Sequence, residues 1–188
     1  MAPTRTRTYI IWHDCLESTN ATARTLRQSV DNLTVIATEC QTAGRGQGDH
    51  VWTSTPGLNL TFSMLLKFAQ GRLLAREEQI INSVVTPAIV GFLASEEIEA
   101  WVKKPNDIWV GDKKIAGILI ENILDGKYVS ESIVGIGFNL NQTQWPDDLP
   151  NPVSLKQLTG RDYSVRDTLE DISERIAELY FKLFDDAI

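Results

Sequence analysis

The segment 134–141 constrains the fold more than any other part of the chain, because large apolar residues alternate in it with glycine and asparagine. Successive side chains of a β-strand point to opposite faces, so the pattern predicts one core face and one face almost cleared of side chains. Glycine inside a strand often marks the close approach of a ligand or of another backbone. A β-bulge or a plain backbone contact explains the pattern equally well. The apolar face is Val134, Ile136, Phe138 and Leu140, and the cleared face is Gly135, Gly137, Asn139 and Asn141.

Apolar periodicity and turn residues predict the remaining elements, which mix hairpins with helices and show no regular strand–helix alternation. We expect strands over residues 9–15, 34–40, 58–66, 98–103, 108–110 and 114–124, and a last one from 127 onward. We expect helices from 18 or 19 to about 30, from 73 to about 95 with a kink or break at Pro87, over 154–158, and after Ser164. This order indicates an α+β fold, with a mixed, largely antiparallel sheet and helices packed mainly on one face.

The overall composition is that of one ordinary globular domain. The chain has 188 residues, of which 43% are hydrophobic, and a chain of this length needs no disulfide or metal to hold it. Its net charge of −7 argues against nonspecific nucleic-acid binding and against docking on an anionic membrane. No apolar run approaches the roughly 18 residues that cross a bilayer, and no signal peptide is visible. We therefore expect a cytoplasmic protein with Cys15 and Cys40 as buried free thiols, rather than a disulfide or a metal pair.

A glycine-rich loop follows the second expected strand and reads Thr-Ala-Gly-Arg-Gly-Gln-Gly-Asp-His over residues 42–50. Its glycines leave the backbone free to wrap a ligand and to aim several N–H groups at it. Arg45 adds a cation with a planar fork of donors, which suits a carboxylate or a phosphate. The pattern alone is weak, since it matches neither the dinucleotide fingerprint nor the P-loop. Trp52, just beyond it, either stacks on a base or closes the core.

Asn106 and Asp107 follow Pro105 and present an amide and a carboxylate side by side. One interpretation is an Asx-type turn between two strands. The other is a purine or ribose contact from Asn106, with Asp107 holding a metal or a cation. The run Ser18-Thr19-Asn20 is explained by helix capping alone.

Lys114 alternates with Ala116 and with apolar residues beyond it, so its stem is expected on the covered side of the sheet. A lysine is rarely buried there unless it has a functional role, and beside Gly117 it could reach a bound phosphate or carboxylate. The alternative is a solvated hairpin lysine. Glu121, at the far end of the strand, is a candidate ion-pair partner for one of the lysines.

Each of these signals is modest, but their order resembles the catalytic domain of the biotin protein ligases, also called biotin–[acetyl-CoA-carboxylase] ligases. The resemblance covers roughly residues 9–186. Its specific parts are the Gly-Arg-Gly segment and the Pro-Asn-Asp…Lys-x-x-Gly pair. The matching motifs lie at 18–20, 41–46, 52, 56–60, 103–107, 114–121 and 135–139. The resemblance implies an α+β fold related to class II aminoacyl-tRNA synthetases and to lipoate ligases.

The resemblance also implies roles for the matching residues. The hydroxyl and amide groups that hydrogen-bond to the ureido ring of biotin would come from Ser18, Thr19, Asn20 and Gln41. The biotin carboxylate and the α-phosphate would lie along Gly44, Arg45, Gly46 and Gln47, with Lys114 between the two groups and Gly117 beside it. The nucleotide would contact Trp52, stacked on adenine, together with Asn106 and Asn139. Lys114 and Arg45 are the implied catalytic residues.

Two departures from the family pattern stand out. Gln47 occupies a position where many members carry arginine, and residues 48–50 lack further basic residues apart from His50. The hold on the phosphate is therefore expected to rest more on Lys114 and on backbone amides. Lys104 replaces the tryptophan often found before Pro-Asn-Asp. We expect a flexible terminus over 1–8 and a catalytic domain over 9–188. A winged-helix DNA-binding domain, and with it a repressor role or a DNA partner, is not expected, nor is an SH3-like C-terminal domain.

The implied activity has two steps: biotin reacts with ATP, assisted by Mg²⁺, to give biotinyl-AMP, and a lysine of a biotin carboxyl carrier protein then takes the biotinyl group. The carrier implied is that of acetyl-CoA carboxylase, and a homodimer is compatible with the family. One alternative is a lipoate or octanoate ligase on the same fold, whose pocket would need no hydrogen-bonding groups for a dithiolane or an alkyl chain. The other is a noncatalytic biotin- or nucleotide-binding module.

Overall fold

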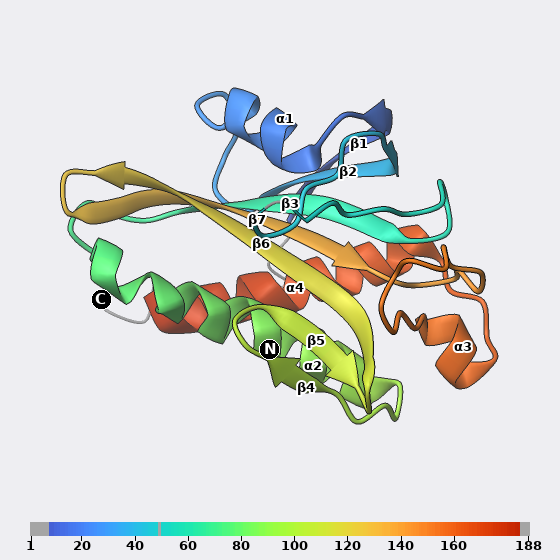
Figure 1. Cartoon of the computed structure of the whole chain (residues 1–188). Helices are drawn as coiled ribbons and strands as arrows, with labels where there is room; N and C mark the ends of the chain where they lie inside the picture. The colour runs from blue at the N-terminus through green and yellow to red at the C-terminus, as the bar shows by residue number, and fades with distance from the viewer. Residues whose placement is uncertain (1–7, 49, 185–188) are drawn as a thin grey trace, which may run out of the picture.

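One sheet of seven strands organises the described part of the chain, residues 8–48 and 50–184 of a computed structural model (Figure 1). Its order is β1-β2-β3-β7-β6-β5-β4, and only β1 and β2 run parallel. The strands are β1 (Tyr9–Leu16), β2 (Thr34–Gln41), β3 (Leu60–Lys67), β4 (Trp101–Lys103), β5 (Asp107–Val110), β6 (Lys113–Asp125) and β7 (Tyr128–Phe138). The predicted mixed, largely antiparallel sheet is confirmed. Apart from Thr8, the terminus expected to be flexible lies outside the described residues.

Helices cover the two faces of the sheet unequally. The long helices α2 (Asn82–Ser95) and α4 (Val165–Phe184) pack together under one face, whereas α1 (Thr19–Leu26) covers β2 and β3 on the other (Figure 1). A 3₁₀ helix, η1 (Ala75–Ile81), leads into α2, and the short α3 (Leu155–Thr159) lies at one end of the sheet (Figure 1). The prediction that helices pack mainly on one face is confirmed. None of the described helices is long and apolar enough to span a membrane.

The alternation in β7 separates two environments. Val134, Ile136 and Phe138 are buried in the main core, between the sheet and the helices α2 and α4. Ile133 lies on the opposite face in a small cluster with Ala23 of α1. Gly135 and Gly137 continue this second face, and because they carry no side chains, Asn20 of α1 and the Trp52 ring can approach the sheet closely there.

Helix α1 is shorter than expected, because it ends at Leu26 rather than near Val30. The Ser18 side chain caps it, accepting from the Ala21 N–H at 3.4 Å. Beyond Leu26 the chain turns, and the Val30 carbonyl accepts a hydrogen bond from Lys67 Nζ at 2.6 Å. That carbonyl is held by the end of β3 instead of continuing a helical ladder.

The long helix expected from residue 73 to about 95 is divided, but not at Pro87. The division falls between η1 and α2, at Ile81 and Asn82, and Pro87 lies inside α2. Proline removes one hydrogen bond from the helix ladder. Pro87 is exposed, so solvent can hydrate the carbonyl that loses its partner.

Cys15 and Cys40 are free thiols, as expected, but they are neither buried nor apart. Cys15 is exposed, Cys40 is half-buried, and they face each other across the β1–β2 pair. The sequence separates them by a helix, so only the strand pairing reveals that they are neighbours.

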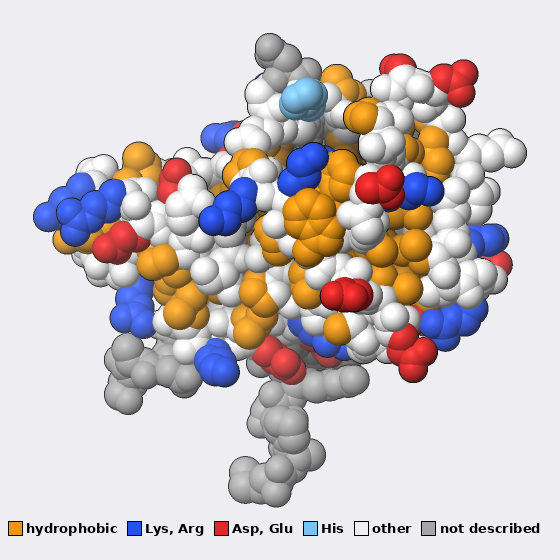
Figure 2. Space-filling view, turned by 60° about the horizontal axis from the view of Figure 1, so that its bottom comes forward, with side chains coloured by type: hydrophobic (Ala, Val, Ile, Leu, Met, Phe, Trp, Pro, Cys, Tyr) orange, Lys and Arg blue, Asp and Glu red, His pale blue; other side chains and the backbone are white. Residues whose placement is uncertain are grey.

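Charged side chains are mixed on the surface. On the face shown in Figure 2, lysines and arginines are scattered among acidic and apolar side chains, without a continuous basic patch. This distribution agrees with the net charge of −7.

Candidate functional site

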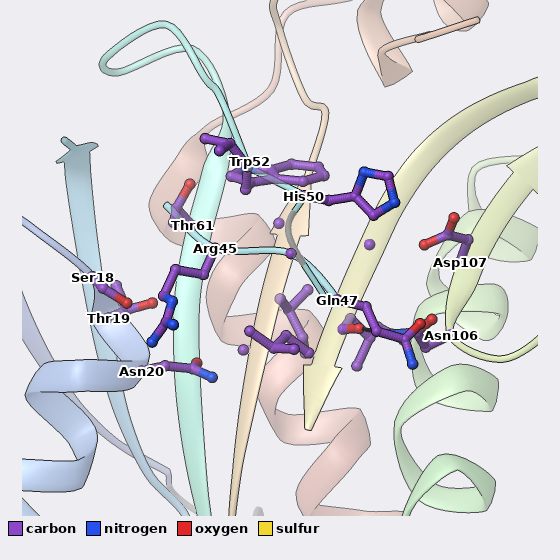
Figure 3. A pocket seen from close by; sticks show the side chains of 18 of the residues that line it. Ser18, Thr19, Asn20, Arg45, Gln47, His50, Trp52, Thr61, Asn106 and Asp107 are labelled. Carbon is purple, nitrogen blue, oxygen red and sulfur yellow. Dashed lines mark hydrogen bonds between the residues drawn. The ribbon is translucent and has the colours of Figure 1, made fainter. Parts of the chain in front are cut away.

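The cleared face of the sheet forms the floor of a cleft of about 220 Å³ (Figure 3). Gly117 of β6 lies directly opposite Gly137 of β7, and Gly135 lies one alternation further along β7. On the other side of β7, Thr61 pairs with Gly137 and Ser63 pairs with Gly135. Strand β3 therefore supplies a short polar side chain beside each cleared position in β7.

The parallel strands β1 and β2 end at one corner of this cleft. Helix α1 starts there with Ser18, Thr19 and Asn20, all buried, and Gln41 closes β2. The Thr19 N–H donates to Gln41 Oε1 at 2.9 Å, and the Thr19 hydroxyl lies 3.3 Å from the same oxygen. The corner therefore holds hydroxyl and amide groups whose positions are set by hydrogen bonds.

Asn20 is held from two sides in this corner. Ser63 Oγ lies 2.5 Å from Asn20 Oδ1, and Asn20 Nδ2 donates to Glu121 Oε2 at 2.9 Å. A Cβ on Gly135 would come within 2.3 Å of Asn20 Oδ1, so this glycine makes room for the amide. Glu121 also pairs with Arg24 at 3.0 Å. The expectation that Glu121 pairs with a lysine is therefore wrong, because α1 brings an arginine closer.

The glycine-rich loop folds back on itself over the cleft. The Trp52 N–H donates to the Gly44 carbonyl at 3.1 Å, and the Gly46 N–H donates to the His50 carbonyl at 2.8 Å. A Cβ on Gly44 would lie 2.2 Å from the Trp52 carbonyl oxygen, so only glycine allows this approach. Gly44 is buried within the loop and does not line the cleft. Arg45 lines the cleft and extends toward the Thr19–Asn20 corner (Figure 3).

Trp52 lies flat against the cleared face. A Cβ on Gly137 would approach its ring to 2.1 Å, and one on Gly117 would approach it to 3.2 Å. The sequence left open whether Trp52 closes the core or meets a ligand, and its ring forms a wall of the cleft. Its indole Nε1 is buried and has no hydrogen-bond partner among the described residues. A buried donor without a partner is uncommon, and the ring that carries this one lines the cleft.

Lys114 reaches the cleft because of an irregularity in its strand. Trp109 pairs with Lys114 and Ile108 with Ala116, so Ile115 is an extra residue, a β-bulge. Ile115 and Ala116 are both buried in the main core, and Lys114 Nζ points to the Gly117 face, at 3.2 Å from a Cβ built there. The prediction that Lys114 lies on the covered side with Ala116 is wrong, because the bulge reverses the alternation.

Asp107 is the partner of this lysine. Its Oδ1 lies 2.7 Å from Lys114 Nζ, and both side chains are about 30% exposed. The sequence suggested a metal or a cation at Asp107, and in the structure the cation is the lysine ammonium. The described residues contain no group of three His, Cys, Asp or Glu side chains that could hold a metal ion.

The two candidate asparagines have different surroundings. Asn106 lines the cleft, and its Nδ2 donates to the Ile118 carbonyl, which fixes the turn before β5. Asn139 is 4% exposed and does not line the cleft. Its Nδ2 donates to the Lys114 carbonyl at 3.3 Å, and its N–H donates to the Ile115 carbonyl at 2.8 Å. Asn139 therefore supports the bulge that aims Lys114.

The structure brings most of the residues selected from the sequence to one cleft. They are Ser18, Thr19, Asn20, Gln41, Arg45, Gly46, Gln47, Trp52, Asn106, Asp107, Lys114 and Gly117. Sequence reasoning missed Thr61 and Leu119 as lining residues, and Ser63 as the group that holds Asn20. The polar alternation of 59, 61 and 63 was visible in the sequence, and it marked the same face as the glycines.

Comparison with known proteins gives a consistent result. The model of the biotin/lipoate A/B protein ligase family matches residues 12–139. The bifunctional ligase/repressor BirA of Bacillus subtilis is 33% identical over 156 residues, which are 81% of this chain and 47% of that protein. The biotin–[acetyl-CoA-carboxylase] ligase of Paracoccus denitrificans is 30% identical over 124 residues, 66% of this chain and 51% of that one. This chain thus spans about half the length of these relatives.

Solved structures show the same architecture. The biotin protein ligase of Aquifex aeolicus in complex with biotin and ATP superposes with a TM-score of 0.76 at 28% identity, over 95% of this chain and 73% of that one. The Leishmania major biotin protein ligase in complex with biotinyl-5-AMP gives a TM-score of 0.71 at 25% identity, over 97% and 82%.

Proposed function

This chain belongs to the biotin/lipoate A/B protein ligase family, and from that premise we propose that it is an ATP-dependent biotin–protein ligase. It would activate biotin as biotinyl-5′-AMP and transfer the biotinyl group to one lysine of a carrier protein. Two solved relatives bind biotin with ATP and biotinyl-5-AMP respectively, and a sequence relative is named for acetyl-CoA carboxylase. These names support the substrates and a biotin carboxyl carrier domain as acceptor. We also propose a cytoplasmic location, a compartment that supplies the ATP the reaction needs.

The observation that carries the proposal is the polar corner at the end of the cleared face, formed by the buried Ser18, Thr19 and Asn20 and the half-buried Gln41. A ureido ring offers two N–H donors and a carbonyl acceptor, which hydroxyl and amide groups can match. The alkyl chain of an octanoyl group, or the dithiolane of a lipoyl group, would displace water from these groups without adding a hydrogen bond to those they already make within the corner, and each donor or acceptor left unsatisfied in this way costs about 1–3 kcal/mol. The corner therefore favours biotin over the lipoyl alternative.

The first step joins the biotin carboxylate to the α-phosphorus of ATP and releases pyrophosphate. Arg45, Gly46 and Gln47 of the glycine loop line the path from the polar corner, and Lys114 supplies a second cation 2.7 Å from Asp107. Cations and amides held in place before reaction stabilise the charge that develops on the phosphate. Mg²⁺ would arrive with ATP, bound chiefly by its phosphates, and Asp107 offers one carboxylate.

The second step is attack by the ε-amine of a carrier lysine on the carbonyl of the mixed anhydride, with AMP as the leaving group. Lys114 and Arg45 would stabilise the tetrahedral charge and the departing phosphate. We propose that Trp52 stacks on the adenine, that Asn106 contacts the nucleotide, and that Asn139 acts on it through Lys114. The folded glycine loop over the cleft would keep water from the anhydride.

The test is to incubate the protein with ATP, labelled biotin and a biotin carboxyl carrier domain, and to measure label on the carrier and release of AMP. We expect label on a single carrier lysine, with none when ATP is omitted or when that lysine is changed to arginine. Retention of biotin without AMP release would contradict the ligase proposal in favour of a binding module. Transfer of lipoate or octanoate instead of biotin would contradict the choice of substrate.

A further inference from the structure

Two thiols meet across the strands that lead into the cleft. Cys15 Sγ donates a hydrogen bond to Cys40 Sγ at 2.9 Å, and the two residues are register partners in the parallel β1–β2 pair. Cys15 is exposed and Cys40 is half-buried. β1 is the outermost strand of the sheet, so solution reagents can reach the pair from the edge.

The strand pairing brings the two residues into the range of backbone separations that disulfides span. Neighbouring strands lie about 4.7–4.9 Å apart, within the roughly 4.4–6.8 Å between Cα atoms that disulfides span. Because Cys15 and Cys40 are register partners, their side chains project to the same face. From their 2.9 Å separation, the sulfurs would approach by only about 0.9 Å to reach a bond length of about 2.05 Å.

The pair lies at the base of the polar corner. Cys40 directly precedes Gln41, whose Oε1 accepts from the Thr19 N–H at 2.9 Å. Just beyond Cys15, the Leu16 carbonyl accepts from the Thr42 N–H at 2.9 Å. The ends of β1 and β2 thus set the spacing between the start of α1 and Gln41, and a covalent tie between the strands would fix that spacing.

We propose that Cys15 and Cys40 form a redox-modification site, in which a reversible disulfide locks β1 to β2 and strengthens biotin binding in the adjoining corner. The effect on biotin rests on the proposed function, whereas the disulfide itself does not. The physical reason for the effect is that β1 has a strand partner on one side only. A disulfide would remove the conformations in which the end of β1 separates from β2. A site that is already held in its binding geometry loses less conformational entropy when the ligand binds.

A low-molecular-weight disulfide such as oxidised glutathione is the oxidant in this proposal. The thiolate of the exposed Cys15 attacks one glutathione sulfur, which breaks the glutathione disulfide, forms a mixed disulfide and releases one glutathione. The Cys40 thiolate then attacks the Cys15 sulfur and releases the second glutathione. Two electrons pass from the protein to glutathione, and the two thiol protons end on the two glutathiones.

The titration of Cys15 affects the rate of this exchange. Its hydrogen bond to Cys40, with some desolvation, raises the pKa of the Cys15 thiol. Since the thiolate is the nucleophile, the rate should keep rising with pH beyond the range in which an ordinary thiol is already ionised.

The experiment is to equilibrate the folded, full-length protein in glutathione buffers of stepped oxidation and to measure intact mass, thermal midpoint and biotin affinity. We expect a loss of about 2 Da from two thiols, a thermal midpoint several degrees above that of the reduced protein, and a biotin Kd lower by about two- to tenfold. Dithiothreitol should reverse all three changes.

Cys15→Ala and Cys40→Ala are the matched variants, and neither residue lines the cleft. Both should bind biotin like the reduced protein and should not respond to the oxidant. Mixed glutathione adducts or disulfide-linked dimers in place of the 2 Da loss would overturn the proposed site, whatever the ligase assay shows. An identical biotin Kd in the two redox states would overturn its effect on the corner. Absence of ligase activity with the mass loss present would count against the proposed function alone.

Discussion

At the scale of single residues, the site depends on the direction in which the β-bulge at Ile115 orients the Lys114 side chain. Ile115 occupies an extra position in β6, and this places Lys114 on the cleared face beside Asp107. Lys113, its neighbour, is exposed on the same hairpin. The two lysines are chemically alike, so any difference between them in catalysis comes from position.

Lys114→Ala should therefore lower the rate of carrier biotinylation by a factor of about 100 or more, since loss of one preorganised donor to transition-state charge costs roughly 3–4 kcal/mol. Lys113→Ala should leave the rate within about twofold of the wild type, because the Lys113 side chain is exposed and does not line the cleft, and such surface changes have small effects. Steady-state kinetics with a carrier domain measures both variants. Near-wild-type turnover by Lys114→Ala would remove this residue from the site.

Gly135→Ala tests the space that the cleared face provides. Its Cβ would lie 2.3 Å from Asn20 Oδ1, and Asn20 is 5% exposed and hydrogen-bonded on two sides. We expect a loss of about 1–3 kcal/mol of stability, as for other overpacked sites, and a biotin Kd at least tenfold higher, as expected when one polar contact worth about 1.4 kcal/mol is displaced.

Gly91→Ala is the control for that substitution. Gly91 lies in α2, and its nearest neighbour would be 3.8 Å from a Cβ. Alanine in a helix is favoured over glycine by about 0.5–1 kcal/mol, so this variant should gain stability and keep its biotin affinity. Urea unfolding and calorimetric titration measure the pair. Equal behaviour of the two variants would show that the close approach to Asn20 has no consequence.

At the scale of secondary-structure elements, Tyr163 joins the segment before α4 to the end of α2. Its hydroxyl donates to Glu96 Oε2 at 2.8 Å, and its N–H donates to Asn141 Oδ1 at 2.9 Å. Burial, together with Glu96, raises the pKa of the Tyr163 phenol, although a hydrogen bond with Thr159 opposes this shift. The folded protein thus prefers the protonated phenol.

Tyr163→Phe should therefore lower stability by about 0.5–1.5 kcal/mol at neutral pH, the usual contribution of one hydrogen bond. Because the folded-state pKa is raised, the contribution of Tyr163 is complete below the ordinary tyrosine pKa of about 10 and disappears as the pH rises through the folded value. The difference between wild type and variant in urea unfolding should therefore stay constant up to about pH 10 and shrink as the pH rises above it. A constant difference would contradict the assigned cause.

At the scale of the whole molecule, the cleft joins elements from both ends of the sheet. The polar corner comes from β2 and the start of α1, whereas Lys114 and Asp107 come from the β5–β6 hairpin. A ligand that contacts both parts should stabilise the fold as a unit. Ligand present at 100 times its Kd adds about 2.7 kcal/mol, which corresponds to a rise of roughly 5–10 °C for a chain of this size.

Biotin with ATP should therefore raise the thermal midpoint more than either compound alone, because the adenylate they form contacts both parts of the cleft. Octanoate with ATP is the control and should add little to the shift given by ATP alone. Differential scanning calorimetry measures the shifts. A larger shift with octanoate than with biotin would contradict the role of the polar corner.

The sequence by itself determined the features that depend on local pattern. Alternation in 134–141 predicted the core face and the cleared face, Ser18 and Ser154 cap helices as their residue types indicate, and each of the hairpin turns at 111–112 and 126–127 contains a glycine with positive φ. The order of the motifs also identified the family. These signals are readable because each depends on neighbours within a few residues in the chain.

Only the tertiary structure decided the features that depend on strand register and on packing between distant segments. The bulge at Ile115 orients the Lys114 side chain toward the cleft. Arg24 forms the ion pair with Glu121, and the β1–β2 register places Cys15 beside Cys40. No local pattern contains these relations, because the free energy that selects them comes from pairing and burial across many intervening residues. A shift of one residue in register moves a side chain to the other face, which is why the alternation alone placed Lys114 on the wrong side.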